Sequence, residues 1–288
     1  MRLKALKCGL ALSCGLLAVS VNAATPEKRA NRPFADADHV VYSLAGGKLP
    51  LPLKSNLTNH GGGVISNPKA VFIFWGPSFN NAASPDYSYA RTLQAYRNWL
   101  GTSSCWPATQ ECGGGTFSPP NLGSGTADWF DTTNPPTNVT DATVQAEVNR
   151  YFSGGHGAFN SSTIYEVVIP SGHYSSSGSS TSCGGPSLSY CSYHGSYSSG
   201  SGKVIYTIQP YPSCAGCKVS GWTDVQNQEH FVLIETVDAT SDPVNGWWDN
   251  TTGQGCMDKC AWSPSPFLVN GYACQYFWSN ANISCIRR

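Results

Sequence analysis

The chain has 288 residues, of which 12% are charged, and its 17 basic and 17 acidic side chains cancel. This balance gives no electrostatic footprint for a nucleic acid or an anionic membrane, which excludes both classes of partner. The length suits one large domain or two small ones, and the absence of a clean linker in the middle favours one.

The first two dozen residues predict a secretory signal peptide, residues 1–24. They begin with basic side chains, continue as an apolar run to Val21, and end with small residues at Ala23 and Ala24. No later run is long and apolar enough to span a bilayer. The mature chain is therefore expected to be a secreted or periplasmic monomer.

After the signal peptide, residues 25–57 are polar, interrupted by proline and without a clear period. They predict a flexible N-terminal arm or a pro-segment. Residues 58–288 then form the expected single domain.

Ten of the 12 cysteines follow the signal peptide. An even number in an exported chain predicts five disulfides. The short spacings make Cys105–Cys112 and Cys274–Cys285 the simplest pairs. Cys214 and Cys217 form a C-x-x-C after a strand with no second C-x-x-C to complete a zinc cage, so both are interpreted as structural disulfide cysteines.

The periodic segments predict an α/β fold with a mixed sheet and packed helices. Apolar runs predict three buried strands, and stripes at helical spacing predict the helices between them. A Ser/Gly-rich loop tied by Cys183 and Cys191 is expected after the second strand, and an irregular, disulfide-stapled part ends the chain. The expected elements are strand 69–76, helix 86–100, helix 141–152 behind a capping Asp141, strand 162–170, loop 171–202, strand 203–210 and helix 223–242.

The last of these helices has clear boundary signals. Thr223 and Gln226 form a Thr-x-x-Gln capping box, and Pro243 must end the helix. Within it, Glu235 and Asp238 are three residues apart, so their carboxyl groups lie on one helical flank.

Several segments together resemble a known family. They are "NHGGGVISNPKAVFIFWG", "YCSYHG", the helix ending in "SDP", "GWWD", "DKCAW" and "NGYACQYFWSNANISC". They resemble a family of secreted bacterial proteins distantly related to the plant phosphate-induced, exordium-like proteins. That family carries His-Glu-x-x-Glu, then Thr-Asp-Pro, Gly-Trp-Tyr-Asp and Asp-x-Cys-Ala-Trp, which is similar to a zinc metalloprotease helix with a downstream carboxylate ligand.

The resemblance implies roles for individual residues when it is anchored at residues 241–243. It puts the catalytic glutamate on Glu235, the second metal ligand on Asp238 and the downstream ligand on Asp258. The first histidine of the motif falls on Ile234, which has no lone pair to donate. His230 cannot simply replace it, because it lies about 12 Å along the helix axis from Asp238 and zinc bonds are about 2 Å long.

Three interpretations remain open for the metal. In the first, Asp238 and Asp258 bind zinc together with His194 of "CSYHG". In the second, these two aspartates and Asp242 or Asp249 form an all-oxygen site that favours calcium. In the third, the chain is an inactive relative without a metal. For His230, a hydrogen-bonded packing role is the alternative to metal binding.

Two functions follow from these interpretations. The first is a zinc-dependent endopeptidase that hydrolyses a polypeptide substrate with a metal-activated water and Glu235 as general base. The alternative is a catalytically inactive extracellular protein that binds a glycan or a cell surface. Nine tryptophans and fourteen tyrosines suit a sugar-binding surface, and Trp247 and Trp248 on an extended segment would face opposite ways.

Overall fold

The computed structural model describes residues 39–42, 54–114 and 128–287, which all fall within one compact unit, Arg32–Arg288. The expected signal peptide and most of the expected arm lie outside the described residues. Across the described ranges, no helix is both long and apolar enough to cross a membrane.

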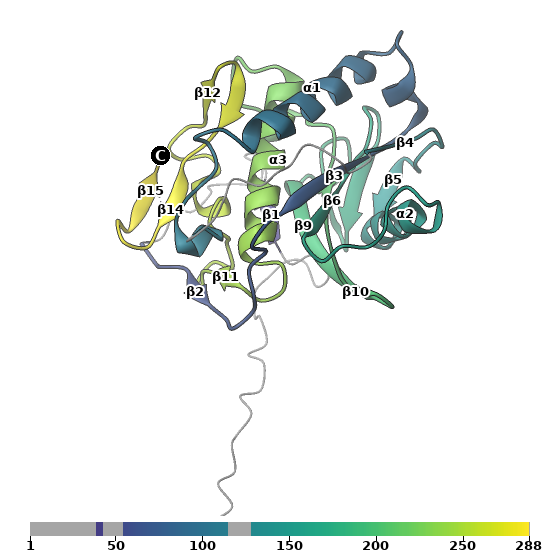
Figure 1. The fold of residues 1–288 in the computed structure, drawn as a ribbon. Coiled ribbons are helices and arrows are strands. Elements are labelled where there is room, and N and C mark those ends of the chain that lie inside the picture. Colours follow the sequence, from purple (N-terminus) through teal and green to yellow (C-terminus); the bar gives the residue numbers. More distant parts are fainter. Residues whose placement is uncertain (1–38, 43–53, 115–127, 288) are drawn as a thin grey trace, which may run out of the picture. The chain divides into compact units, whose positions relative to one another are not determined.

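A six-stranded mixed sheet forms the centre of this unit (Figure 1). Four strands run parallel to one another, and the two at one end run antiparallel to their neighbours. The expected mixed α/β architecture is therefore confirmed. The strands lie in the order β1 (His39–Tyr42), β9 (Tyr190–Ser199), β10 (Gly202–Gln209), β6 (Thr163–Val168), β3 (Lys69–Trp75) and β4 (Trp129–Asp131).

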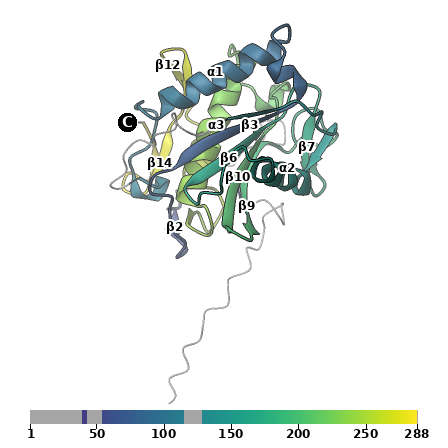
Figure 2. The same cartoon turned by 45° about the vertical axis from the view of Figure 1, so that its right-hand side comes forward.

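Helices cover both faces of the sheet (Figure 2). Helices α1 (Pro85–Leu100) and α3 (Asp224–Ser241) lie on one face, and α2 (Asp141–Ser153) lies on the other. Strand β3 is apolar from Ala70 to Trp75 because its alternate residues supply both layers. Phe72 and Phe74 join the cluster with α1 and α3, whereas Val71 and Ile73 join the cluster with α2.

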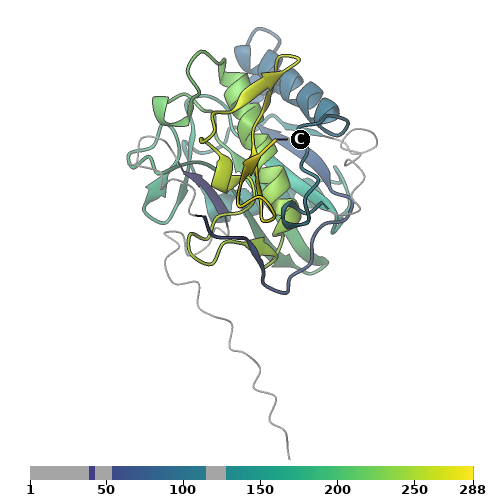
Figure 3. The same cartoon turned by 90° about the vertical axis from the view of Figure 1, so that its left-hand side faces the viewer.

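The C-terminal part packs against α3 on the side away from the sheet (Figure 3). It consists of short strands, four of which form two hairpins, as the irregular, stapled segment predicted. Its strands are β11 (Trp247–Trp248), β12 (Phe267–Val269), β13 (Tyr272–Cys274), β14 (Phe277–Ser279) and β15 (Ser284–Ile286), and the remaining short strands of the chain are β2 (Thr58–Asn59), β5 (Asn138–Thr140), β7 (Tyr174–Ser177) and β8 (Ser180–Thr181).

Ten cysteines form five disulfides, which confirms the expected number. The two simplest pairs are both wrong, because the segment around residues 105–112 crosses to the C-terminal part and finds its partners there. The disulfides are Cys105–Cys274, Cys112–Cys256, Cys183–Cys214, Cys191–Cys217 and Cys260–Cys285.

Two local predictions are also wrong. The stretch 171–202 is not a loop, since it contains β7, β8 and the ten-residue β9. Strand β9 forms despite its serines because β1 and β10 satisfy its backbone on both sides. Asp141 does not cap α2, because the N-cap is Thr140; Asp141 instead accepts hydrogen bonds from the hydroxyls of Tyr193 and Tyr206.

Candidate functional site

Helix α3 carries most of the candidate site residues and is buried along nearly its whole length. The expected capping box is present, with Gln226 N donating to Thr223 Oγ1 and Thr223 N donating to Gln226 Oε1. The helix ends at Ser241, before Pro243, as expected. Every residue from 227 to 241 is buried, because the sheet and α1 cover some sides of the helix and the C-terminal hairpins cover another.

Glu235 points from α3 to strand β9. Its Oε1 accepts a hydrogen bond from Ser192 Oγ at 2.7 Å, and its Oε2 lies 3.0 Å from His194 Nδ1. The Glu235 side chain is 1% exposed. The carboxylate therefore bridges a serine and a histidine inside the protein. A Ser-His-Glu catalytic triad would require the histidine in the middle, so this is a different arrangement.

Asp238 points to the turn that precedes Asp258. Its two carboxyl oxygens accept hydrogen bonds from the backbone N–H groups of Met257 at 2.8 Å and Asp258 at 3.0 Å. Burial and then the adjacent Asp258 carboxyl raise the pKa of Asp238 well above its ordinary value, although these two hydrogen bonds oppose the shift. The two carboxyl groups that the resemblance implies as ligands are thus neighbours.

The space beside Asp238 is filled by backbone. A Cβ atom added to Gly255 would lie 2.6 Å from Asp238 Cγ and 2.7 Å from its Oδ2. The Asp258 carboxyl accepts a long hydrogen bond from Gly255 N at 3.4 Å. The turn at residues 255–258 is therefore closely packed around the Asp238 carboxyl group.

The residues on the preceding turns of α3 are packed into the interior. His230 Nε2 lies 2.5 Å from Gln275 Oε1, and its ring packs edge-on against Trp262. Burial lowers the pKa of His230 to about 4. Ile234 is fully buried in the apolar cluster that also contains Met257. His230 and Ile234 are therefore packing residues, which for His230 is the alternative to metal binding.

The other two aspartates of the all-oxygen interpretation do not converge on Asp238. Asp242 Oδ1 accepts a hydrogen bond from Gly246 N at the end of α3. Asp249 forms an ion pair with Lys259 and accepts a hydrogen bond from Thr251 N at 2.8 Å. Each of these carboxylates organises its own turn.

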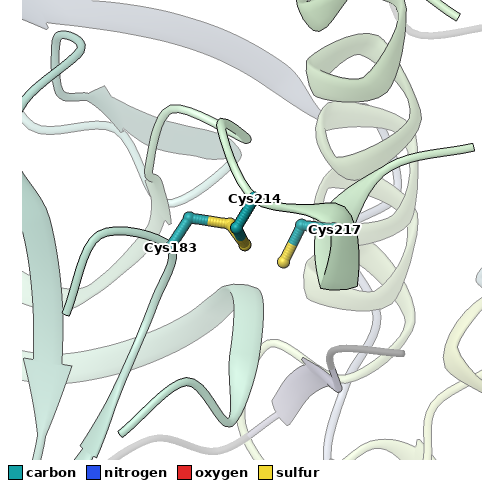
Figure 4. A group of neighbouring side chains, drawn as sticks. All are labelled: Cys183, Cys214 and Cys217. Carbon is teal, nitrogen blue, oxygen red and sulfur yellow. A yellow bond between two sulfur atoms is a disulfide. The ribbon is translucent and has the colours of Figure 1, made fainter. Parts of the chain in front are cut away.

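The potential metal ligands near α3, among the residues that the structure describes, are not arranged to hold a zinc or calcium ion. In the described ranges, one group of three potential ligand atoms lies within 4.8 Å of one another, and it consists of Cys183, Cys214 and Cys217 (Figure 4). These cysteines belong to two disulfides, so they offer no thiolate. Neither Asp238, Asp258 and His194 nor the aspartates alone form such a group.

A groove lies at the C-terminal end of α3, where its lining residue Gly113 packs against Thr240 and Ser241. Its volume is about 540 Å³, and the described residues that line it carry no charge. They are Asn59, Gly62, Gly63, Val64, Ser66, Asn67, Gln110, Gly113, Gly114 and Trp247. Ile65 N donates to Thr240 O, which ties this segment to α3.

The groove was missed at the sequence level, apart from Trp247. Its walls come from segments far apart in the chain, and much of its surface is glycine backbone. Gly62 leaves no room for a side chain, because a Cβ there would lie 2.1 Å from Val244 O. The run "HGGG" was the available signal, since three successive glycines often mark close approach of backbone to a neighbour or a ligand.

The two tryptophans of strand β11 have different surroundings. Trp247 lines the groove, while the ring of Trp248 stacks on His60 with centroids 3.5 Å apart. β11 pairs with β2, with Trp247 opposite Asn59. The stacking of Trp248 on His60 therefore stabilises the position of β11, the strand that also carries Trp247.

No family model, curated protein or solved structure matches this sequence.

Proposed function

We propose that this protein is a secreted or periplasmic, non-catalytic protein that binds a neutral glycan in the groove at the end of α3. The observation that carries the proposal is the lining of the groove, in which amide side chains and glycine backbone surround the half-buried Trp247. Five disulfides are typical of an extracellular compartment and support this location.

The chemistry of the lining suits a sugar. Asn59, Asn67 and Gln110 offer both hydrogen-bond donors and acceptors, which match the hydroxyl groups of a saccharide. An indole ring buries the apolar face of a sugar by stacking. The volume lies within the range of about 300–1,000 Å³ that ligand sites commonly have. Because the described lining is uncharged, an uncharged saccharide fits it better than a phosphorylated or acidic one.

The buried carboxylates support binding over hydrolysis. Both oxygens of Glu235 already have partners on β9, and both oxygens of Asp238 accept backbone N–H groups. Neither side chain is exposed. A general base must reach the proton that it abstracts, and a sealed carboxylate does not reach a polypeptide substrate.

The zinc endopeptidase remains the second hypothesis, because Asp238 and Asp258 are adjacent and His194 contacts Glu235. Metal analysis of the purified protein tests it directly. Stoichiometric zinc together with cleavage of an unfolded polypeptide would support the enzyme, and the absence of both would exclude it.

The glycan proposal is tested with neutral oligosaccharides, using intrinsic tryptophan fluorescence and calorimetry. Trp247→Ala should weaken binding by about 0.5–1.5 kcal/mol, which is roughly a twofold to twelvefold increase in Kd. Trp222→Ala is the matched control, since Trp222 is also half-buried but is not part of the groove lining. The proposal fails if no neutral oligosaccharide binds, or if both variants weaken binding equally.

A further inference from the structure

Lys259 and Asp249 form a sealed ion pair that neither proposed function uses. Their side chains are 0% and 1% exposed, and Lys259 Nζ contacts Asp249 Oδ2 directly. Lys259 lies in the short helix Asp258–Cys260, and Asp249 follows β11. Burying both charges costs several kcal/mol per ion before their attraction is counted, so a charged pair is an expensive arrangement in this interior.

Each oxygen of the Asp249 carboxyl group accepts a hydrogen bond from a different residue. Oδ1 accepts a hydrogen bond from Thr251 N at 2.8 Å. Oδ2 accepts one from Ser55 Oγ at 2.5 Å, and Lys259 Nζ also lies 3.5 Å from this hydroxyl oxygen. The ring of Trp278 covers the amine, with Nζ 4.4 Å from the ring centroid. The carboxyl carbon is thus polarised from both oxygens, with the amine alongside.

We propose that Lys259 and Asp249 condense into an intramolecular isopeptide bond. One proton first passes from the Lys259 ammonium to Asp249, which leaves a neutral amine and a neutral carboxylic acid. Lys259 Nζ then attacks Asp249 Cγ, and a C–N bond forms. The negative charge that develops on Oδ1 is stabilised by Thr251 N–H.

The second half of the reaction expels Oδ2. Ser55 Oγ donates a proton to Oδ2 and recovers one from the nitrogen, the C–Oδ2 bond breaks, and one water molecule leaves. No atom changes its oxidation state, and no other reactant is needed. The product is an uncharged secondary amide, which removes both buried charges.

The ion pair is the starting state of this reaction. Burial raises the pKa of Asp249, but hydrogen bonds from Lys259, Ser55 and Thr251 lower it by more. The first proton transfer follows the existing Lys259–Asp249 contact and does not change the net charge of the pair. For that reason it requires no proton from solvent.

Peptide mapping of the full-length secreted protein tests the proposal. After reduction and alkylation, a tryptic digest should contain the linked species as one peptide, residues 219–287, which holds both Asp249 and Lys259 and is one water lighter than its sequence mass. Trypsin should also fail to cleave after Lys259, because an acylated lysine is not a substrate. A complete digest with an unmodified Lys259 would overturn the proposal and leave an ion pair.

Two variants make the result specific. Lys259→Arg keeps the positive charge but should lose the linked species. Asp249→Asn should yield a product of the same mass as the wild type, because its condensation releases ammonia and forms the same amide. Loss of one water mapped to another site would also overturn the proposal, and wild-type mapping decides the matter if either variant fails to fold.

Discussion

Replacing Gly255 by alanine tests the contact between α3 and the turn at residues 255–258. The backbone of Gly255 is not in the left-handed region, so alanine is not strained there for conformational reasons. Its Cβ would, however, lie 2.6 Å from Asp238 Cγ, which is shorter than the contacts that Cβ atoms make in real proteins. The Asp238 carboxyl group must move, and its hydrogen bonds from Met257 N and Asp258 N must weaken.

The expected cost combines two effects. Overpacking a close-packed interior costs about 1–3 kcal/mol. Weakening one hydrogen bond to a carboxylate costs about 1.5–3 kcal/mol. Gly255→Ala should therefore lower the free energy of unfolding by about 2.5–6 kcal/mol, with an unchanged denaturant slope, in urea titrations of the disulfide-intact protein followed by tryptophan fluorescence.

A matched control and a double mutant make this result decisive. Gly63→Ala adds a Cβ that meets nothing within 4 Å, so its effect should stay within about 0.5 kcal/mol. In an Asp238→Ala background the Gly255→Ala cost should largely disappear, because the clashing group is gone. If Gly255→Ala is as stable as Gly63→Ala, the close packing around Asp238 is refuted.

Three further predictions concern other positions. Because burial lowers the pKa of His230 from 6.5 to about 4, the unfolded state binds more protons between these values. Acidification from pH 6.5 to 4 should therefore lower the free energy of unfolding of the wild type by up to about 3 kcal/mol more than that of His230→Gln. Urea titrations in which the two proteins lose stability in parallel over this pH range would contradict this. Ile234→His should destabilise the protein by about 1–3 kcal/mol without creating a zinc site, because it buries a polar ring beside engaged carboxylates; zinc uptake by dialysis and metal analysis would show the opposite and favour the enzyme. Replacing Cys191 and Cys217 together by serine opens a loop with a sequence separation of 26 and should lower the free energy of unfolding by about 3.5 kcal/mol, whereas an unchanged urea midpoint would contradict the loop-entropy account.

The sequence predicted correctly those features that depend on neighbouring residues alone. Thr223, Gln226 and Pro243 fix both ends of α3 because capping and chain termination depend on neighbouring residues alone. Strand β9 was missed because serine and glycine have low strand preference, and its stability comes from pairing with distant β1 and β10.

The candidate site was predictable only in part. His194 was named through the family resemblance, and the structure brings it to Glu235 in another role, as a hydrogen-bonding neighbour. Ser192 was not named, although the two-residue period of a strand places it on the same face as His194. For the groove, the sequence carried a signal for one wall, the glycines after His60, but not for the others, because the walls meet only after the chain folds.

Two of the disulfides have a consequence for biosynthesis. Cys105 and Cys112 leave the ribosome close together, but their partners, Cys274 and Cys256, follow 169 and 144 positions later. In an oxidising compartment the two early thiols are each other's nearest reaction partners for most of synthesis. The native bonds then require exchange with an incoming thiolate, so the yield of correctly paired protein should depend on a disulfide isomerase in the compartment where the chain folds.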